Sequence, residues 1–125
     1  MKLDNELKSR DNIFKLMDKI KDYDLYTRKY VINDIPKVYN DIRIHILDEL
    51  FDLVKNIKLS SLTKGNIQIK NLINALLNIS VLDYLFDLLL QLNLCNKDKL
   101  IKSLSKLTDI KNICYSWYNK VNVEK

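Results

Sequence analysis

The residue types that perform acid–base or nucleophilic catalysis are scarce in this sequence. Histidine is the commonest general base near neutral pH, and the chain has one, His45, which lies between Ile44 and Ile46. We interpret it as a surface or partly buried side chain. There is no glycine-rich phosphate loop, no HExxH, and no serine flanked by glycines. The sequence therefore predicts a protein that is not an enzyme, with no catalytic residue.

Acidic residues gather in two short stretches, which raises the question of a metal site. Neither stretch has the Glu-x-x-His pairs with which helical bundles hold two iron ions, and the only cysteines, Cys95 and Cys114, lack CxxC spacing. We interpret the cysteines as buried free thiols in a cytoplasmic protein, and the acidic residues as solvated helix faces. We expect no metal and no cofactor. The stretches contain Asp18, Asp22 and Asp24, and Asp48, Glu49 and Asp52.

Lysine is the residue type whose clustering points most clearly to a function. The chain has a formal net charge of +5, which suits a nucleic-acid or acidic-protein partner. Seven lysines lie in residues 96–125, against three acidic residues. Lys99, Lys102 and Lys106 fall close together on a helical wheel, and lysines clustered on one surface can neutralise nucleic-acid phosphates. Ordinary solvation of a helix face is the alternative interpretation.

The candidate contacts to nucleic acid or a protein partner extend beyond this cluster. Three aromatic residues that follow the lysines, Tyr115, Trp117 and Tyr118, could stack on bases, although such aromatics more often close the end of a helical core. RNA and DNA are both possible ligands. The full set of candidate contact residues is Lys97, Lys99, Lys102, Lys106, Lys111, Lys120 and Arg43.

Helices must position these residues, because apolar side chains recur at three- and four-residue steps along most of the chain. We expect helices over about 12–33, 37–58, 67–94 and 96–121. Asp11 or Asn12 is the expected N-cap of the first helix and Asn96 that of the last. Pro36 lies in the expected connection between the first two helices. Residues 59–66, which include Gly65, are the expected second connection. The whole chain, 1–125, suffices for one core, so we predict a single all-α domain: an antiparallel, up-down-up-down four-helix bundle.

The third expected helix is unusually apolar. Between Val81 and Leu94 leucines occur on nearly every side of the helical wheel, which favours burial all round. Asp83 and Asp87 make a membrane span unfavourable, so we expect no membrane contact. A small monomeric bundle normally leaves one face of each helix in water. The surplus of apolar surface therefore predicts a homo-oligomer.

The order of these features resembles a known family. Its parts are the stretch from Ile35 to Tyr39, a leucine-dense third helix around Leu82 to Leu85, and a last helix that closes on Trp117. This order is similar to the accessory variability determinant (Avd) proteins, which accompany the reverse transcriptases of diversity-generating retroelements. They share their bundle with four-helix proteins encoded by intervening sequences in bacterial ribosomal RNA genes. The chain departs from the family where two glycines usually precede the tryptophan, since it has Tyr115 and Ser116 there.

The resemblance implies a specific role. Proteins of this family form positively charged homopentameric rings that bind their reverse transcriptase and its template RNA, and they support copying without catalysing it. By this resemblance the chain is expected to be a non-enzymatic accessory protein that binds a reverse transcriptase and nucleic acid. The alternative is a structural or protein-interaction bundle that binds no nucleic acid.

Overall fold

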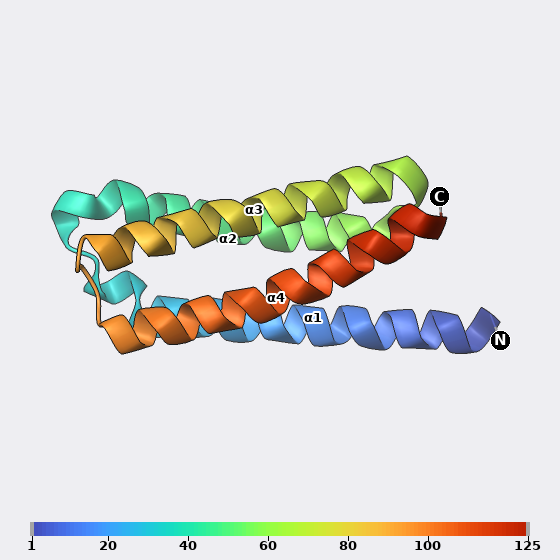
Figure 1. The fold of residues 1–125 in the computed structure, drawn as a ribbon, viewed down its shortest axis with the longest axis horizontal. Coiled ribbons are helices and arrows are strands. Elements are labelled where there is room, and N and C mark those ends of the chain that lie inside the picture. Colours follow the sequence, from blue (N-terminus) through green and yellow to red (C-terminus); the bar gives the residue numbers. More distant parts are fainter. Residues whose placement is uncertain (1, 125) are drawn as a thin grey trace.

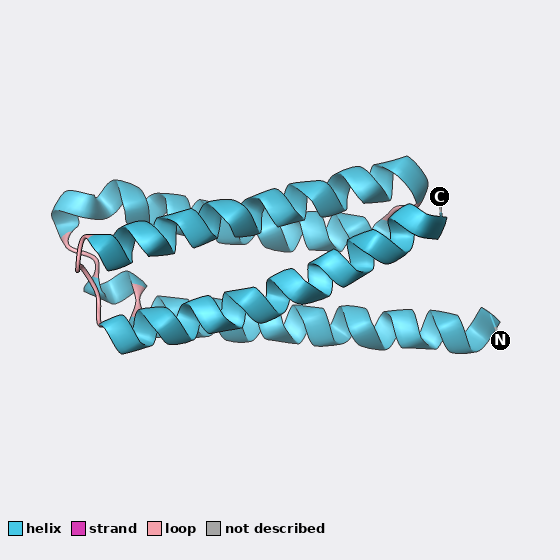
Figure 2. Cartoon of the chain, viewed as in Figure 1, coloured by secondary structure: helices cyan, strands magenta, loops and turns pink. Residues whose placement is uncertain are grey.

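The computed structural model describes residues 2–124, with side chains from 13 to 123, and it is an all-α four-helix bundle. The helices are α1 (Lys2–Tyr30), α2 (Asn40–Leu62), α3 (Gly65–Gln91) and α4 (Lys97–Glu124), and two short 3-10 turns, Ile32–Asp34 and Lys37–Tyr39, join α1 to α2. Each helix runs antiparallel to the one before it, in the predicted up-down-up-down order (Figure 1). Nearly all of the described chain is helical, with short connections gathered at the two ends (Figure 2).

One apolar core runs along the bundle axis and includes residues from all four helices. The largest fully buried side chains are Tyr23 and Phe86, whose rings meet edge to face with centroids 5.9 Å apart. The packing is uneven: α3 contacts both α2 and α4 extensively, α1 packs mainly on α4, and the contact between α1 and α2 is thin. The position of α1 therefore depends chiefly on its contact with α4.

The first helix begins about ten residues earlier than predicted. The expected cap at Asp11 or Asn12 is wrong, because the backbone there is already helical from Lys2 onward. The apolar periodicity starts at Ile13, but the preceding residues include Lys, Glu and Leu, which favour a helix without supplying a periodic apolar face. The helix also ends earlier than expected, at Tyr30 rather than Asn33.

The predicted connection at 59–66 is mostly helix. Only Thr63 and Lys64 separate α2 from α3. Side chains satisfy carbonyls of the last turn of α2: the Thr63 hydroxyl donates to Leu59 O at 2.7 Å, and the Gln68 amide donates to Ser60 O at 2.9 Å. The chain then reverses at Gly65, whose φ of +66° is readily adopted only by glycine. At its start, α2 is preceded by a 3-10 turn and so begins at Asn40, not at residue 37.

The third helix ends at Gln91, three residues before the predicted end. Asn93 takes a left-handed conformation with φ 55°, and the following N–H groups bond back into the last turn: Leu94 N–H to Leu89 O at 3.2 Å, and Asn93 N–H to Leu90 O at 3.2 Å. This pattern is a Schellman C-cap. The predicted cap of the next helix is confirmed, since Asn96 Oδ1 accepts the Lys99 N–H at 3.1 Å.

The apolar surface of α3 is distributed differently from the expectation. Of the apolar side chains from Val81 to Leu94, the bundle fully buries Leu82, Leu85, Phe86 and Leu89 and partly buries four others. The large apolar side chains that remain exposed lie mainly upstream and on the outer side: Ile67, Ile73, Leu77, Tyr84 and Leu92. By length and composition α3 could also cross a membrane, a test that buried core helices pass as well. In this structure its inner side forms part of the core.

Candidate nucleic-acid interface

The structure brings three of the predicted lysines together and adds residues from α1 to them. On α4, Lys99, Lys102 and Lys106 lie at intervals of three and four residues and so project from one side of the helix. That side faces the outer edge of α1, where Tyr26 and Tyr30 lie four residues apart. We name the combined surface the lysine–tyrosine face and define it by six residues: Tyr26, Lys29, Tyr30, Lys99, Lys102 and Lys106.

The two tyrosine rings form the centre of this face. Their centroids are 4.7 Å apart, and both side chains are half-buried between α1 and α4. Each ring has two ammonium groups over it. Lys99 Nζ lies 4.7 Å and Lys29 Nζ 5.3 Å from the Tyr30 centroid, and Lys106 Nζ lies 5.3 Å from the Tyr26 centroid, with Lys102 Nζ at 5.6 Å. These are cation–π distances, and each contact contributes about 0.5–1 kcal/mol at an exposed site.

One carboxylate partly neutralises the face. Lys106 Nζ donates to Asp22 Oδ2 at 2.6 Å, which adds a direct ion pair between α4 and α1. Asp98 and Asp109 lie on α4 within about 40° of Lys102 on the helical wheel and therefore border the face. The other three lysines make no ion pair with the described residues. The face is thus positively charged but not free of acids.

A buried polar contact beneath the face fixes the spacing of the two helices. The hydroxyls of Thr27 and Ser103 hydrogen-bond at 2.9 Å across the α1–α4 contact, and both side chains are fully buried. The hydroxyl of Tyr23 lies beside them and has no hydrogen-bond partner among the described residues. Burial raises the pKa of Tyr23 far above its ordinary range. Tyr23 is therefore neutral and structural.

The remaining predicted contact residues do not join this face. Lys97 is exposed at the start of α4, and Lys120 lies five helical turns beyond Lys102 on the same side, about 27 Å away. Arg43 is turned inward, where it donates to the carbonyls of Ile32, at 3.3 Å, and of Ile35. Its guanidinium therefore holds the connection between α1 and α2 together.

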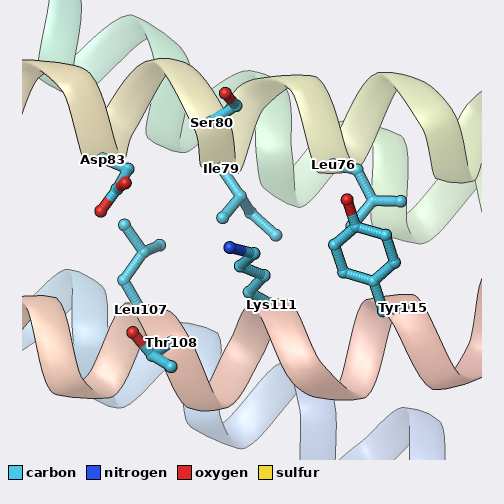
Figure 3. A pocket seen from close by; sticks show the side chains of 8 residues that line it. All are labelled: Leu76, Ile79, Ser80, Asp83, Leu107, Thr108, Lys111 and Tyr115. Atoms are coloured by element: carbon cyan, nitrogen blue, oxygen red, sulfur yellow. The ribbon is translucent and has the colours of Figure 1, made fainter.

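Lys111 points to a different part of the surface, a groove of about 200 Å³ between α3 and α4. The Lys111 side chain extends into the groove from α4 and the Asp83 carboxylate extends into it from α3 (Figure 3). Ligand pockets usually enclose about 300–1,000 Å³, so this groove is smaller than a typical small-molecule site. The lining residues are Leu76, Ile79, Ser80, Asp83, Leu107, Thr108, Lys111 and Tyr115.

The residue types weighed for catalysis or metal binding are dispersed. His45 is exposed on α2, and within residues 13–123 no three histidine, cysteine or acidic side chains come close enough to hold a metal ion. The acidic stretches are divided among local contacts: Asp24 pairs with Arg28 at 2.6 Å, and Glu49 accepts the Asn78 amide at 2.8 Å. The structure gives these residues no shared site.

Both cysteines are free, but the expectation that both are buried holds for only one. Cys114 is fully buried, whereas Cys95 is half-buried with its thiol 3.6 Å from Val31 O. Burial raises the pKa of Cys114 to about 12. The pKa of Cys95 rises to about 11, chiefly through burial and further through the Asp34 charge. Neither thiol is a thiolate near neutral pH.

Sequence reasoning missed the contribution of α1 to the lysine–tyrosine face. Tyr26 and Tyr30 continue the apolar spacing that begins at Ile13, which indicates core residues and not a binding surface. Lys29 lies outside the lysine cluster of residues 96–125. The spacing of Tyr26 and Tyr30, four residues apart at the edge of the apolar side, could have indicated a pair at a helix–helix boundary. Of the three aromatics predicted to stack on bases or close the core, Trp117 packs against the core.

Comparison with known proteins identifies no relative. No family model, no curated protein and no solved structure matches the chain. The resemblance to the Avd proteins therefore stays a hypothesis. The structure shows an all-α four-helix bundle. On the surface formed by α1 and α4, four lysines lie around two tyrosines.

Proposed function

We propose that this chain is a non-enzymatic accessory protein that binds nucleic acid through the lysine–tyrosine face. The observation that carries the proposal is the arrangement of Lys29, Lys99, Lys102 and Lys106 around the paired rings of Tyr26 and Tyr30. Four ammonium groups from two helices gather on one surface, with one direct carboxylate partner at Lys106. Phosphate binding requires this kind of clustered positive charge on an accessible surface.

The tyrosines make a single-stranded ligand more suitable than a duplex. Single-stranded nucleic acid binds to surfaces that combine positive charge with aromatic rings on which bases stack. In the free protein the lysines lie over the rings. When the ammonium groups turn to phosphates, the half-buried rings of Tyr26 and Tyr30 are uncovered for a base. On binding, each ring would lose a cation–π contact with a lysine and gain a stacked base, while the lysine would gain a contact to a phosphate.

The partner protein in this proposal is a reverse transcriptase, and its support is the sequence resemblance to the Avd family. The resemblance also implies self-association into a ring of five subunits. The exposed apolar side chains of α3 support self-association independently, because exposed apolar surface favours a protein contact. An adjacent reverse-transcriptase gene with a nearly duplicated template repeat is the expected genomic setting. A chain encoded away from any such gene would contradict this half of the proposal.

Three features of the described residues favour a non-enzymatic role. His45 is exposed on α2 and does not belong to the lysine–tyrosine face. Both thiols are protonated near neutral pH, so neither is an activated nucleophile. The α3–α4 groove is smaller than a typical substrate pocket.

A second candidate function is a structural or protein-interaction bundle without nucleic-acid binding. It is favoured by the contacts that the lysines make within the chain, above all the Lys106–Asp22 ion pair and the cation–π contacts to α1. Since α1 packs mainly on α4, these contacts could serve the fold alone. The two functions differ in one measurable respect, the binding of a single strand.

The two functions can be distinguished by comparing two variants, one with lysines of the lysine–tyrosine face neutralised and one with lysines elsewhere neutralised. A variant with Lys99, Lys102 and Lys106 replaced by glutamine should bind a labelled single-stranded RNA at least about tenfold more weakly, because three phosphate contacts are lost. The matched control replaces the exposed Lys55, Lys58 and Lys70 by glutamine, which lowers the net charge equally on α2 and α3. Fluorescence anisotropy measures binding, and circular dichroism checks that both variants remain helical.

The control decides how a loss of binding is interpreted. Binding that weakens only in the α4 variant supports the lysine–tyrosine face. Equal weakening in both variants means that net charge alone matters, and it overturns the assignment of the site. Wild-type protein that binds no single strand at about 50 mM salt leaves the structural bundle as the function.

A further inference from the structure

The two halves of the lysine–tyrosine face are held differently in the free protein. At Tyr30, the two lysines over the ring make no ion pair with the described residues. At Tyr26, by contrast, Lys106 Nζ lies 5.3 Å from the ring centroid and also donates to Asp22 Oδ2 at 2.6 Å. Among the described residues, a carboxylate therefore holds a lysine at the Tyr26 half alone.

The helix itself places Asp22 beside Tyr26. The two residues lie four positions apart on α1, so their side chains are neighbours on one side of the helix. The side chain of Asp22 is 64% exposed, whereas that of Lys106 is 25% exposed. Helix α1 thus holds the Lys106 ammonium group with two groups, a ring and a carboxylate, and the carboxylate remains open to solvent.

A nucleic-acid phosphate and the Asp22 carboxylate are anions that require the same ammonium group. An ammonium group has three donors, but sharing it would place two anions side by side, which costs free energy. We propose that Asp22 competes with the phosphates of a single strand for Lys106 and so weakens binding at the Tyr26 half of the face. A base reaches Tyr26 less readily than Tyr30, because uncovering the Tyr26 ring also requires breaking the ion pair.

The exposure of the ion pair sets the size of this effect. Ion pairs at exposed sites contribute little free energy, and the side chain of Asp22 is mostly exposed. Loss of such a pair on binding corresponds to an affinity that is about two- to fivefold lower. The competition therefore adjusts the affinity for a single strand without preventing binding, and Lys106 still contacts a phosphate in the complex.

This inference rests on the proposed function, because it concerns a competitor for the ligand of the same face. The test measures the affinity of the full chain for a labelled oligouridine by fluorescence anisotropy at about 50 mM salt. Asp22→Asn keeps the shape of the side chain and removes its charge, so it should strengthen binding about two- to fivefold more than the control does. The control, Asp18→Asn, removes the same charge from an exposed residue about one helical turn earlier on α1.

Repeating both substitutions in a Lys106→Gln background shows whether the gain in affinity depends on Lys106. In that background Asp22→Asn should strengthen binding no more than Asp18→Asn does, because the contested ammonium group is absent. Circular dichroism checks that the variants remain helical. An effect of Asp22 on the fold alone would not produce this dependence on Lys106.

The outcomes that contradict the competition differ from those that contradict nucleic-acid binding. Equal gains for Asp22→Asn and Asp18→Asn, with Lys106 present, overturn the role of Asp22 and leave nucleic-acid binding in place. A larger gain for Asp22→Asn that persists in the Lys106→Gln background means that the carboxylate repels the strand directly, which also overturns the competition. If the wild type and all variants fail to bind, the proposed function is wrong, and this inference is wrong with it.

Discussion

At the scale of single residues, side chains of the same charge make different contacts in the structure. Lys106 and Lys111 both lie on α4, yet one lies over Tyr26 and pairs with Asp22, while the other lines the α3–α4 groove. Arg43, which the sequence groups with the lysines as a positive charge, donates to backbone carbonyls instead. Charge and spacing identify candidates, but the direction of each side chain depends on which helix lies beside it.

The buried thiol of Cys114 makes the stability of the fold sensitive to alkaline pH. Burial raises its pKa to about 12 in the folded state, whereas an exposed thiol titrates near 9.0. Above pH 9 the unfolded chain therefore loses a proton that the folded chain keeps. The free energy of unfolding is unaffected by this group below pH 9 and falls as the pH rises toward 12.

The measurement compares wild type with Cys114→Ala in urea unfolding at pH 8 and at pH 10.5. We expect wild type to lose more stability than the variant between the two pH values, since the variant has no thiol to titrate. The difference between the two losses is informative because other groups titrate equally in both proteins. Parallel losses would show that the Cys114 thiol does not have a raised pKa.

At the scale of elements, the sequence predicted the type and order of all four helices but not their ends. The apolar periodicity identifies each helix because it reflects which side faces the core. Helix ends depend on single hydrogen bonds that periodicity does not report. The serine-rich segment after residue 59 was assigned to a loop on composition, yet Ser60 and Ser61 bond back to carbonyls of their own helix. Similarly, Asn93 ends α3 within a run of leucines.

The connection between α1 and α2 should depend on Arg43. Its guanidinium donates to the Ile32 and Ile35 carbonyls and, at 2.9 Å, to Asn40 Oδ1. Replacing it by methionine keeps much of the apolar stem but leaves the carbonyls without this donor, which should cost about 1–3 kcal/mol of folding free energy.

Chemical denaturation of Arg43→Met measures this cost, and Lys55→Gln on the same helix is the control. A substitution at an exposed position such as Lys55 changes the free energy of unfolding by no more than about 0.5 kcal/mol. If the Arg43 variant is no less stable than the control, the guanidinium is not needed for the connection. Because the contact between α1 and α2 is thin, we expect Arg43→Met to lower the stability more than Lys55→Gln does.

At the scale of the whole molecule, the antiparallel bundle could be predicted because its core residues recur at helical spacing and its connections are short. The candidate site could be predicted only in part. The lysines of α4 were recognised from their clustering, whereas their tyrosine partners come from α1, about 75 residues away in sequence. A pattern within one helix does not indicate which neighbour it faces. The α1–α4 pairing had to be seen before the face could be defined.

The same limit applies to the apolar surplus of α3. Counting leucines on a helical wheel predicted exposed surface between Val81 and Leu94, but the helix is central in the bundle and contacts both α2 and α4. Its neighbours fully bury four apolar side chains of that segment and partly bury four more. The large apolar side chains of α3 that stay exposed are Ile67, Ile73, Leu77, Tyr84 and Leu92.

The central claim is that the lysine–tyrosine face binds the phosphates of a single strand, and its most direct test is the salt dependence of that binding. Each phosphate contact on a single strand contributes a slope of about −0.7 to log affinity against log salt. With three or four lysines engaged, the slope for single-stranded RNA should lie between about −2 and −3 from about 50 to 200 mM salt. The variant with Lys99, Lys102 and Lys106 replaced by glutamine keeps only Lys29 of this face, so its slope should fall to between about −0.7 and zero. An identical slope in wild type and variant, or no binding by wild type at the lowest salt, would contradict the account.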